Sequence, residues 1–220
     1  MYEIEIKSLL GGPESAERLE ARMRELDPQL ETLGAHRQLN HYFEGKGDLA
    51  ALAPLIKDAE TRAAFLDLAG KAGNASLRTR DADGRVLLVL KAAIDDTTSA
   101  NGTARRELEA ESEMPIEKLD GEIEKAGFSC QAKWSRERKE FRFKGTNVTI
   151  DRNAGYGYLA EFEKIESDGS RAEAAKAELR ALMAELGIEE LPQNRLARMF
   201  DFYNAHWRDY YGTEKTFTVQ

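Results

Sequence analysis

The chain opens with a stretch that alternates apolar and charged residues, Tyr2-Glu3-Ile4-Glu5-Ile6-Lys7. Successive side chains of a β-strand point to opposite faces, so the charges at positions 3, 5 and 7 share one face and the apolar residues share the other. The ordinary explanation is a sheet with one face on a core and one face in water. The remaining sequence decides whether that explanation is sufficient.

Like charges at the same spacing of two recur in three later segments that also have the pattern of strands. These pairs are Arg78/Arg80, Arg136/Arg138 and Glu161/Glu163. A single pair fits a solvated face, but four pairs of repelling charges favour a shared binding role. Carboxylates are preferred ligands of Mg²⁺, Arg offers a planar fork that fits phosphate, and Lys offers a point charge. The pattern therefore favours a concave face that holds a divalent cation together with a phosphate chain.

Around these pairs, the periodicity predicts an α+β fold rich in antiparallel strands. Strands are expected at 2–10, 38–43, 75–80, 85–92, 103–113, 128–143, 147–151 and 156–165. Helices are expected at 13–33 with an interruption near Pro28, and at 115–127, 170–186 and 194–207, with a helical insertion at about 48–72. Tight turns at 81–84 and 144–147 suit hairpins, and the spacing typical of βαβ units is missing. We expect one domain over residues 1–207, a polar loop at 95–102, and a tail at 208–220 with room for one more strand.

Composition narrows the class of protein. The chain has 220 residues, a net charge of −8, 41% hydrophobic residues and 33% charged residues, which is typical neither of disordered chains nor of membrane proteins. The acidic N-terminal stretch does not resemble a signal peptide, and Cys130 is the only cysteine, so a cytoplasmic location is expected. The acidic total argues against nucleic acid as a partner. Residues 76–152 nevertheless carry 15 basic and 15 acidic residues, a dense and balanced mixture.

In the order of these motifs, the chain resembles the CYTH superfamily, the triphosphate tunnel metalloenzymes. Glu3-Ile4-Glu5-Ile6-Lys7 matches the E-x-E-x-K signature at the N-terminus of that family. The further matches are Arg78-Thr79-Arg80 to its R-x-R strand, Lys91 to the lysine that closes the next strand, Glu107 and Glu109 to its acidic strand, Arg136 and Arg138 to its later basic pair, and Asp151 with Glu161-Phe162-Glu163 to its closing D…E-x-E pattern. The resemblance covers residues 2–165. The departures are the long insertion before Arg78 and Gly155-Tyr156-Gly157-Tyr158-Leu159-Ala160 in place of the commoner Leu-Gly form. Two assignments also stay open, because Arg105 and Arg106 compete for one position of the family pattern and Lys133 competes with Arg136 for another.

The resemblance implies a closed antiparallel β-barrel with helices packed outside. Each strand would send Glu, Arg or Lys into the lumen and apolar residues outward against those helices. Small barrels are usually filled with apolar side chains, and burying many charges is costly unless opposite charges and bound ions neutralise them. We therefore expect the empty barrel to be less stable than the ligand-bound barrel.

The resemblance also implies roles for individual residues. The expected ligands of one or two Mg²⁺ or Mn²⁺ ions are Glu3, Glu5, Glu107, Asp151, Glu161 and Glu163. The expected contacts to the triphosphate are Lys7, Arg78, Arg80, Lys91, Arg136 and Arg138. Glu3, Glu5 and Lys7 are the expected catalytic residues.

Three functions fit this lining. The first is metal-dependent hydrolysis of a triphosphate-containing substrate, either inorganic tripolyphosphate or a nucleoside or thiamine triphosphate, because it requires only the charged residues. The second is a class IV-type adenylate cyclase, which would convert ATP to cyclic AMP and pyrophosphate and would need an additional pocket for the base and ribose. The third is a polyphosphate- or nucleotide-binding module without turnover, to which so many carboxylates would bring no benefit.

The turn at residues 155–158 bears on the choice of substrate. Its glycines suggest a flexible mouth that admits water, which favours a short polyphosphate, so tripolyphosphate is expected to be cleaved faster than ATP. The expected partner is a small triphosphate-containing substrate, with no nucleic acid and no membrane, and a homodimer is left open.

Overall fold

The computed structural model describes residues 2–71, 75–93 and 105–219, and its centre is an eight-stranded antiparallel barrel. The strands are β1 (Tyr2–Gly11), β2 (Glu31–Glu44), β3 (Ala75–Ala82), β4 (Arg85–Ala93), β5 (Arg105–Ser112), β6 (Ser129–Phe143), β7 (Thr146–Asn153) and β8 (Gly157–Glu166). Their order around the barrel is β1-β5-β4-β3-β2-β6-β7-β8. The seam between β1 and β5 is a single residue pair, Glu3 opposite Arg105. The predicted fold class, an α+β protein with a closed antiparallel barrel, is confirmed.

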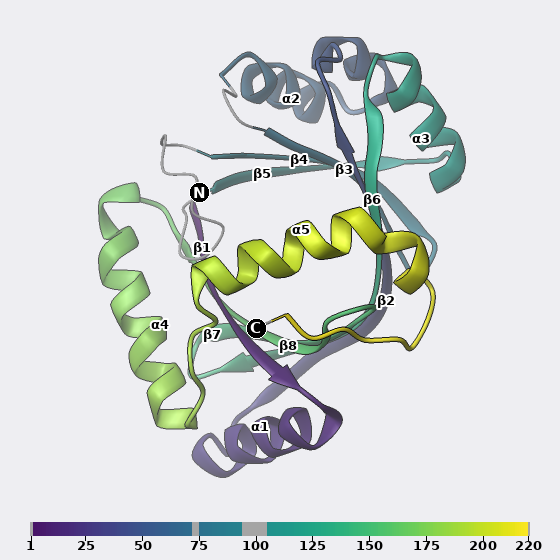
Figure 1. The fold of residues 1–220 in the computed structure, drawn as a ribbon. Helices are drawn as coiled ribbons and strands as arrows, with labels where there is room; N and C mark the ends of the chain where they lie inside the picture. The colour runs from purple at the N-terminus through teal and green to yellow at the C-terminus, as the bar shows by residue number, and fades with distance from the viewer. Residues whose placement is uncertain (1, 72–74, 94–104, 220) are drawn as a thin grey trace.

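Helices cover the outside of the barrel (Figure 1). They are α1 (Pro13–Leu26), the 3₁₀ turn η1 (Leu49–Leu55), α2 (Ala59–Lys71), α3 (Ile116–Lys125), the short 3₁₀ turn η2 (Gly169–Arg171), α4 (Ala172–Leu186) and α5 (Gln193–Tyr210). The predicted helical insertion is observed as η1 and α2, except for its last residue. Three predicted parts lie outside the described residues: that last residue, the loop at 95–102, and the first two residues of the strand predicted at 103–113.

Among the described residues, three apolar clusters lie between the barrel and these helices, and two of them do not involve α5. In one, β1, β6, β7 and β8 pack against α1 and α4, with Ile4, Ile6 and Phe162 fully buried. In the other, β3, β4 and β5 pack against η1, α2 and α3. Each fully buried side chain of this size contributes roughly 1.5–3 kcal/mol. Because the apolar set of every strand faces outward, the alternate charged set must face the lumen.

Helix α5 and the C-terminal tail close one end of the lumen. Trp134 lies on the same face of β6 as Arg136 and Arg138, yet it packs against Tyr203 of α5 with ring centroids 3.6 Å apart. The Tyr203 hydroxyl donates to the Lys133 carbonyl at 2.8 Å. Helix α5 crosses the front of the barrel in Figure 1. The charged lining therefore gives way to an aromatic plug at this end.

The turn at residues 155–158 belongs to that plug and does not form a flexible mouth. Tyr156 is buried against Trp134 and Phe217, with ring centroids 4.9 and 5.3 Å away. Gly155 has φ +82°, and a Cβ there would lie 2.7 Å from the Tyr203 ring. Glycine is thus needed at position 155, both for the left-handed backbone and for the close packing against Tyr203. The prediction of an open, flexible turn is wrong, because the tail, which the sequence places far away, covers it.

Three boundaries differ from the predictions. Helix α1 ends at Leu26, and β2 begins at Glu31, seven residues before the predicted start at 38. The first half of β2 pairs only with the end of β6 and is largely exposed, so it lacks the apolar alternation by which strands are found. Helix α5 continues to Tyr210, and the tail beyond it makes only an isolated bridge between Gly155 and Thr216. The domain boundary at 207/208 stays a prediction.

Candidate active site

The lumen is lined by the charged face of every strand except β2, which contributes uncharged polar residues. The described residues with ionisable side chains are Glu3, Glu5 and Lys7 on β1, Arg78 and Arg80 on β3, Lys91 on β4, Glu107 and Glu109 on β5, Arg136 and Arg138 on β6, Asp151 on β7, and Glu161 and Glu163 on β8. All twelve residues predicted to bind metal or phosphate are therefore brought together around one space. Each arrives there because strand alternation places its apolar neighbours in the outer cores.

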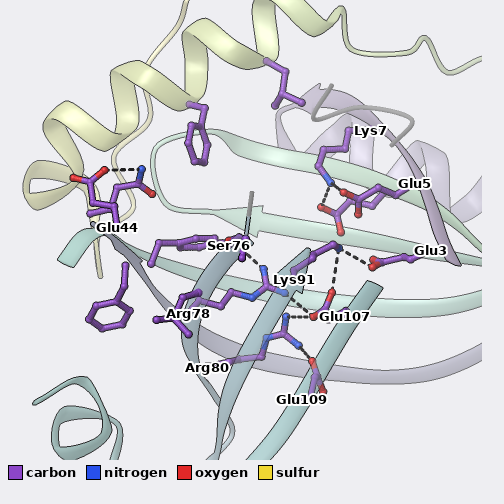
Figure 2. Close-up of a pocket in the computed structure, with 18 of the residues that line it drawn as sticks. Glu3, Glu5, Lys7, Glu44, Ser76, Arg78, Arg80, Lys91, Glu107 and Glu109 are labelled. Carbon is purple, nitrogen blue, oxygen red and sulfur yellow. Dashed lines mark hydrogen bonds and ion pairs between the residues drawn. The ribbon is translucent and has the colours of Figure 1, made fainter. Parts of the chain in front are cut away.

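One half of the lining links β1, β3, β4 and β5. The Lys91 Nζ atom lies 2.7 Å from Glu3 Oε2 and 3.1 Å from Glu107 Oε2. The same Glu107 accepts from Arg78 at 2.8 Å, and Arg80 pairs with Glu109. Figure 2 shows Lys91 between Glu3 and Glu107, with the two arginines alongside.

The other half links β1, β6, β7 and β8. Arg138 donates two bonds to the fully buried Asp151, at 2.7 and 2.6 Å, and a third bond to Glu161 at 2.5 Å. Lys7 lies between Glu161 and Glu5, with Nζ–O distances of 2.8 and 3.1 Å. Burial opposes ionisation of Glu161, but Lys7 and Arg138 outweigh it and hold its pKa well below the usual range. Charge-assisted bonds of this kind keep both partners ionised.

Negative charge is left uncompensated on one side of the lumen. Burial, together with repulsion from Glu3 and Glu5, raises the pKa of Glu163 to about 7. Glu163 stands directly opposite Glu5 in the β1–β8 ladder, and no side-chain hydrogen bond or ion pair joins it to another described residue. A cation at this place would relieve the repulsion.

Three arginines lie together on the opposite side, on β3 and β6, each paired with a carboxylate. Burial and the neighbouring Arg78 lower the pKa of Arg80 to about 10, so that it stays charged at neutral pH but repels its neighbours. The third member of this group is Arg136, whose Nε atom donates to Gln38 at 2.7 Å and whose Nη1 atom donates to Asp151 at 3.0 Å. An anion in front of these arginines would relieve that repulsion in the same way.

The donors beside Glu163 suit a hard divalent cation. The Asn147 Oδ1 and Thr149 Oγ1 atoms are buried without a hydrogen-bond partner among the described residues, and they lie on β7 opposite Glu163 and Glu161. Carboxylate, amide and hydroxyl oxygens are the ligands that Mg²⁺ and Mn²⁺ prefer. In the described part of the chain, no three acidic, histidine or cysteine residues are already drawn together as a metal cluster, because most of these carboxylates pair with Lys or Arg. These residues can therefore coordinate a divalent ion once some of those ion pairs rearrange.

Most of the chain matches a known protein family. The sequence model of the CYTH domain matches residues 1–195. The chain belongs to the CYTH family. No curated protein sequence matches it.

Solved structures share the CYTH fold of this chain at low sequence identity. A conserved hypothetical protein from Pyrococcus furiosus is 21% identical with a TM-score of 0.62, covering 85% of this chain and 91% of its own. A putative adenylate cyclase from Vibrio parahaemolyticus is 14% identical with a TM-score of 0.60, covering 91% and 98%. A putative adenylyl cyclase from Hippeastrum, described as having a dominant triphosphatase activity, is 19% identical with a TM-score of 0.51, covering 92% and 96%. At these identities the likeness shows the fold alone.

The CYTH lumen also contains polar residues outside the predicted set of site residues. Tyr42 accepts a hydrogen bond from Arg78 at 2.8 Å, and Asn40 accepts one from Arg80 at 3.0 Å. With Gln38 they occupy alternate positions on β2, so strand alternation could have found them if uncharged residues had been considered. Asn147 and Thr149 follow the same rule on β7, in phase with Asp151.

The cavity in this CYTH barrel is larger than its charged part. Its volume is about 1150 Å³, and it extends from Glu3, Lys7 and Glu163 to a second region. That region is formed by Tyr42, Phe43, Glu44, Gly45, Gly47, Leu49, Phe128, Gln131, Ala197, Phe200 and Asp201. No helix in the described residues is long and apolar enough to cross a membrane.

Proposed function

We propose that this CYTH chain is a divalent-metal-dependent hydrolase of triphosphate-containing compounds. The observation that carries the proposal is the arrangement of one lumen, which has a carboxylate side, with Glu3, Glu5 and Glu163 on the paired strands β1 and β8, and an arginine side, with Arg78, Arg80 and Arg136 on β3 and β6. An anion-binding protein would not need the first side, and a cation-binding protein would not need the second. A phosphate chain with a divalent cation neutralises both at once.

The basic residues that would bind the phosphates come from four strands of the lumen, β1, β3, β4 and β6. The triphosphate contacts would be Lys7, Arg78, Arg80, Lys91, Arg136 and Arg138, and several strands would hold the chain of phosphates in one orientation. Arg138 is fixed by Asp151, which orients its guanidinium before any substrate arrives. Phosphoryl transfer depends mainly on such positioning and on neutralisation of charge.

The acidic residues would hold the ion. Glu3, Glu5, Glu161 and Glu163 are the main candidates, with Glu107 and Asp151 farther along the lumen, and Asn147 supplies an additional oxygen. When bound, Mg²⁺ or Mn²⁺ neutralises charge on the phosphoryl oxygens and lowers the pKa of water. Lys7 lies between Glu5 and Glu161, so it would contact substrate beside the ion and act with Glu3 and Glu5 as a catalytic residue.

A panel of substrates tests this proposal. Tripolyphosphate, thiamine triphosphate, ATP and GTP are incubated with Mg²⁺ or Mn²⁺, and phosphate, pyrophosphate and cyclic nucleotide are quantified. We expect phosphate release that stops in excess EDTA and in Glu161→Gln, while Glu189→Gln, an exposed control, retains activity. Full activity in excess EDTA would contradict metal dependence.

Adenylate cyclase activity is the second candidate, and the region of the cavity beyond the phosphates favours it. Equimolar cyclic AMP and pyrophosphate as the main products from ATP would select it over hydrolysis. Binding of triphosphates with no product in any reaction would select the third candidate, a module without turnover.

A further inference from the structure

The second region of the cavity differs in chemistry from the first. The described residues that line it include no Lys or Arg, whereas Glu44 and Asp201 are acidic, and Leu49, Phe128 and Phe200 are apolar. Phosphate would meet repulsion from these two carboxylates, and Arg78, which borders the region through its bond to Tyr42, is already paired with Glu107. The occupant of this region must therefore be a neutral or positively charged organic group.

An aromatic platform stands at this end. Phe200 of α5 lines the cavity and is 36% exposed, which is unusual for a side chain of its size. One face of its ring stacks on Trp134, with centroids 6.0 Å apart and an interplanar angle of 18°. A ring held from behind and accessible in front suits stacking with a planar ligand.

Hydrogen-bond acceptors line the same cavity. The Gln131 Nε2 atom donates to Glu44 Oε2 at 3.3 Å, and both side chains line the cavity. A carboxylate has two acceptor oxygens and an amide has one, so this pair can accept from an amino group of a ligand. A neutral carbonyl at that position would gain less from Glu44.

One strand connects the two regions. Ser76, Arg78 and Arg80 alternate along β3 and line the cavity in sequence, and Figure 2 shows Ser76 between Glu44 and the charged cluster. Two residues of a strand span roughly 7 Å, so the path from Arg80 to Ser76 is about 13 Å long. A group attached to a triphosphate held by the arginines could extend along this strand past Ser76 into the part of the cavity lined by Phe200 and Glu44.

We propose that Phe200, Gln131 and Glu44 bind a planar, amino-bearing ring joined to the triphosphate, so that organic triphosphates are preferred over inorganic tripolyphosphate. The inference rests on the proposed function, since it concerns the same lumen. It reverses the preference for tripolyphosphate that the sequence favours, because the turn on which that preference depended is buried in the aromatic plug.

Substrate ratios test the proposal. The ratio of kcat/KM for ATP to kcat/KM for tripolyphosphate should exceed one in the wild type and fall at least tenfold in Phe200→Ala. The ratio for ATP to ITP, which lacks the amino group, should fall towards one in Glu44→Ala. Leu66→Ala, an exposed apolar residue on α2, and Glu31→Gln, an exposed acid at the far end of β2, are the matched controls and should change neither ratio. Thiamine triphosphate, assayed in parallel, distinguishes an aminopyrimidine from an aminopurine as the ring.

Two results would overturn the proposal. One is an equal loss towards ATP and tripolyphosphate in Phe200→Ala, which would mean that α5 merely supports the phosphate site. The other is a wild-type preference for tripolyphosphate. If no substrate is turned over, calorimetry gives the same comparison from the affinities for ATP and for tripolyphosphate. Tighter binding of ATP that depends on Phe200 would support this inference even though the proposed hydrolase activity fails. Equal affinities would contradict the inference.

Discussion

Glu163 lies opposite Glu5 across two hydrogen-bonded strands, and it is the residue where charges of the lumen are least balanced. Its neighbour Glu161, two positions earlier on the same face, has Lys7 and Arg138 as partners. The different environments explain why one carboxyl has a raised pKa and the other a lowered pKa. Glu161 and Glu163, two glutamates on one face of β8, therefore differ in how readily they ionise.

Replacing Glu163 should change how stability depends on pH. Its pKa rises from 4.5 to about 7 on folding, so the native state binds the proton more tightly. The associated stability is present below about pH 4.5 and is lost as the pH rises through 7, a loss on the order of 3 kcal/mol. Glu163→Gln should avoid that loss. In urea unfolding with EDTA present, the free energy of unfolding of Glu163→Gln should therefore exceed that of the wild type by more at about pH 8.5 than at about pH 5.

Two comparisons complete this test. Glu189→Gln, at an exposed position, should match the wild type at both pH values. An unchanged difference between Glu163→Gln and the wild type at both pH values would show that Glu163 is not the group whose titration destabilises the native state.

Removing a guanidinium from the positive side should weaken triphosphate binding. Arg78→Ala or Arg80→Ala removes a charge-assisted contact worth roughly 1.5–3 kcal/mol, which corresponds to an affinity about 10- to 150-fold lower. Arg85→Ala, an exposed arginine on β4, should have little effect. Calorimetry with tripolyphosphate and Mg²⁺ measures the three affinities, and equal losses would indicate binding by overall charge and not by the lumen.

At the scale of elements, α3 is attached to the barrel through a buried polar contact as well as through apolar packing. Asp120 of α3 lies 2.7 Å from His41 Nδ1 and accepts from Thr79 Oγ1 at 2.7 Å. His41 Nε2 in turn lies 3.0 Å from the Tyr211 hydroxyl, just beyond α5. These side chains lie outside the lumen, so the contact joins two helices to the wall without entering the site.

Asp120→Ala should destabilise the protein by about 2–3 kcal/mol, because Thr79 and His41 would remain buried without their partner. Urea unfolding measures the loss, and Glu124→Ala, an exposed acid on the same helix, should cost less than about 0.5 kcal/mol. Affinity for tripolyphosphate should be nearly unchanged in folded Asp120→Ala. A loss of affinity comparable with that of Arg78→Ala would place this contact in the binding site instead.

At the scale of the whole molecule, the barrel encloses more charge than its own pairs neutralise. Mg²⁺ with tripolyphosphate should therefore stabilise it, by about 2.7 kcal/mol at a ligand concentration 100 times Kd. For a protein of this size that corresponds to a rise in Tm of roughly 5–10 °C. Thermal unfolding with Mg²⁺ and tripolyphosphate together, with each alone, and with EDTA measures the effect. Full stabilisation by tripolyphosphate in EDTA would show that the metal takes no part.

The strand pattern was sufficient to place the charged and the apolar residues of each strand on opposite faces. Alternation at spacing two needs no long-range information, because it follows from the geometry of a single strand. Each like-charged pair therefore lies on one face of its strand, namely Glu3 and Glu5, Arg78 and Arg80, and Glu161 and Glu163. Their meeting in one lumen was an expectation from the resemblance to CYTH proteins, and the register of the strands bears it out.

The sequence by itself determined which residues of each strand are charged and that their apolar neighbours face a core. Only the tertiary structure decided which charges lack a partner, because the pKa of Glu163 depends on carboxylates from two strands. It also decided the chemistry of the cavity's second region and the burial of the turn at Tyr156, since α5 and the tail approach from about 40 to 60 residues away in the sequence. Local periodicity is a property of one segment, whereas burial and electrostatic balance arise only where distant segments pack together.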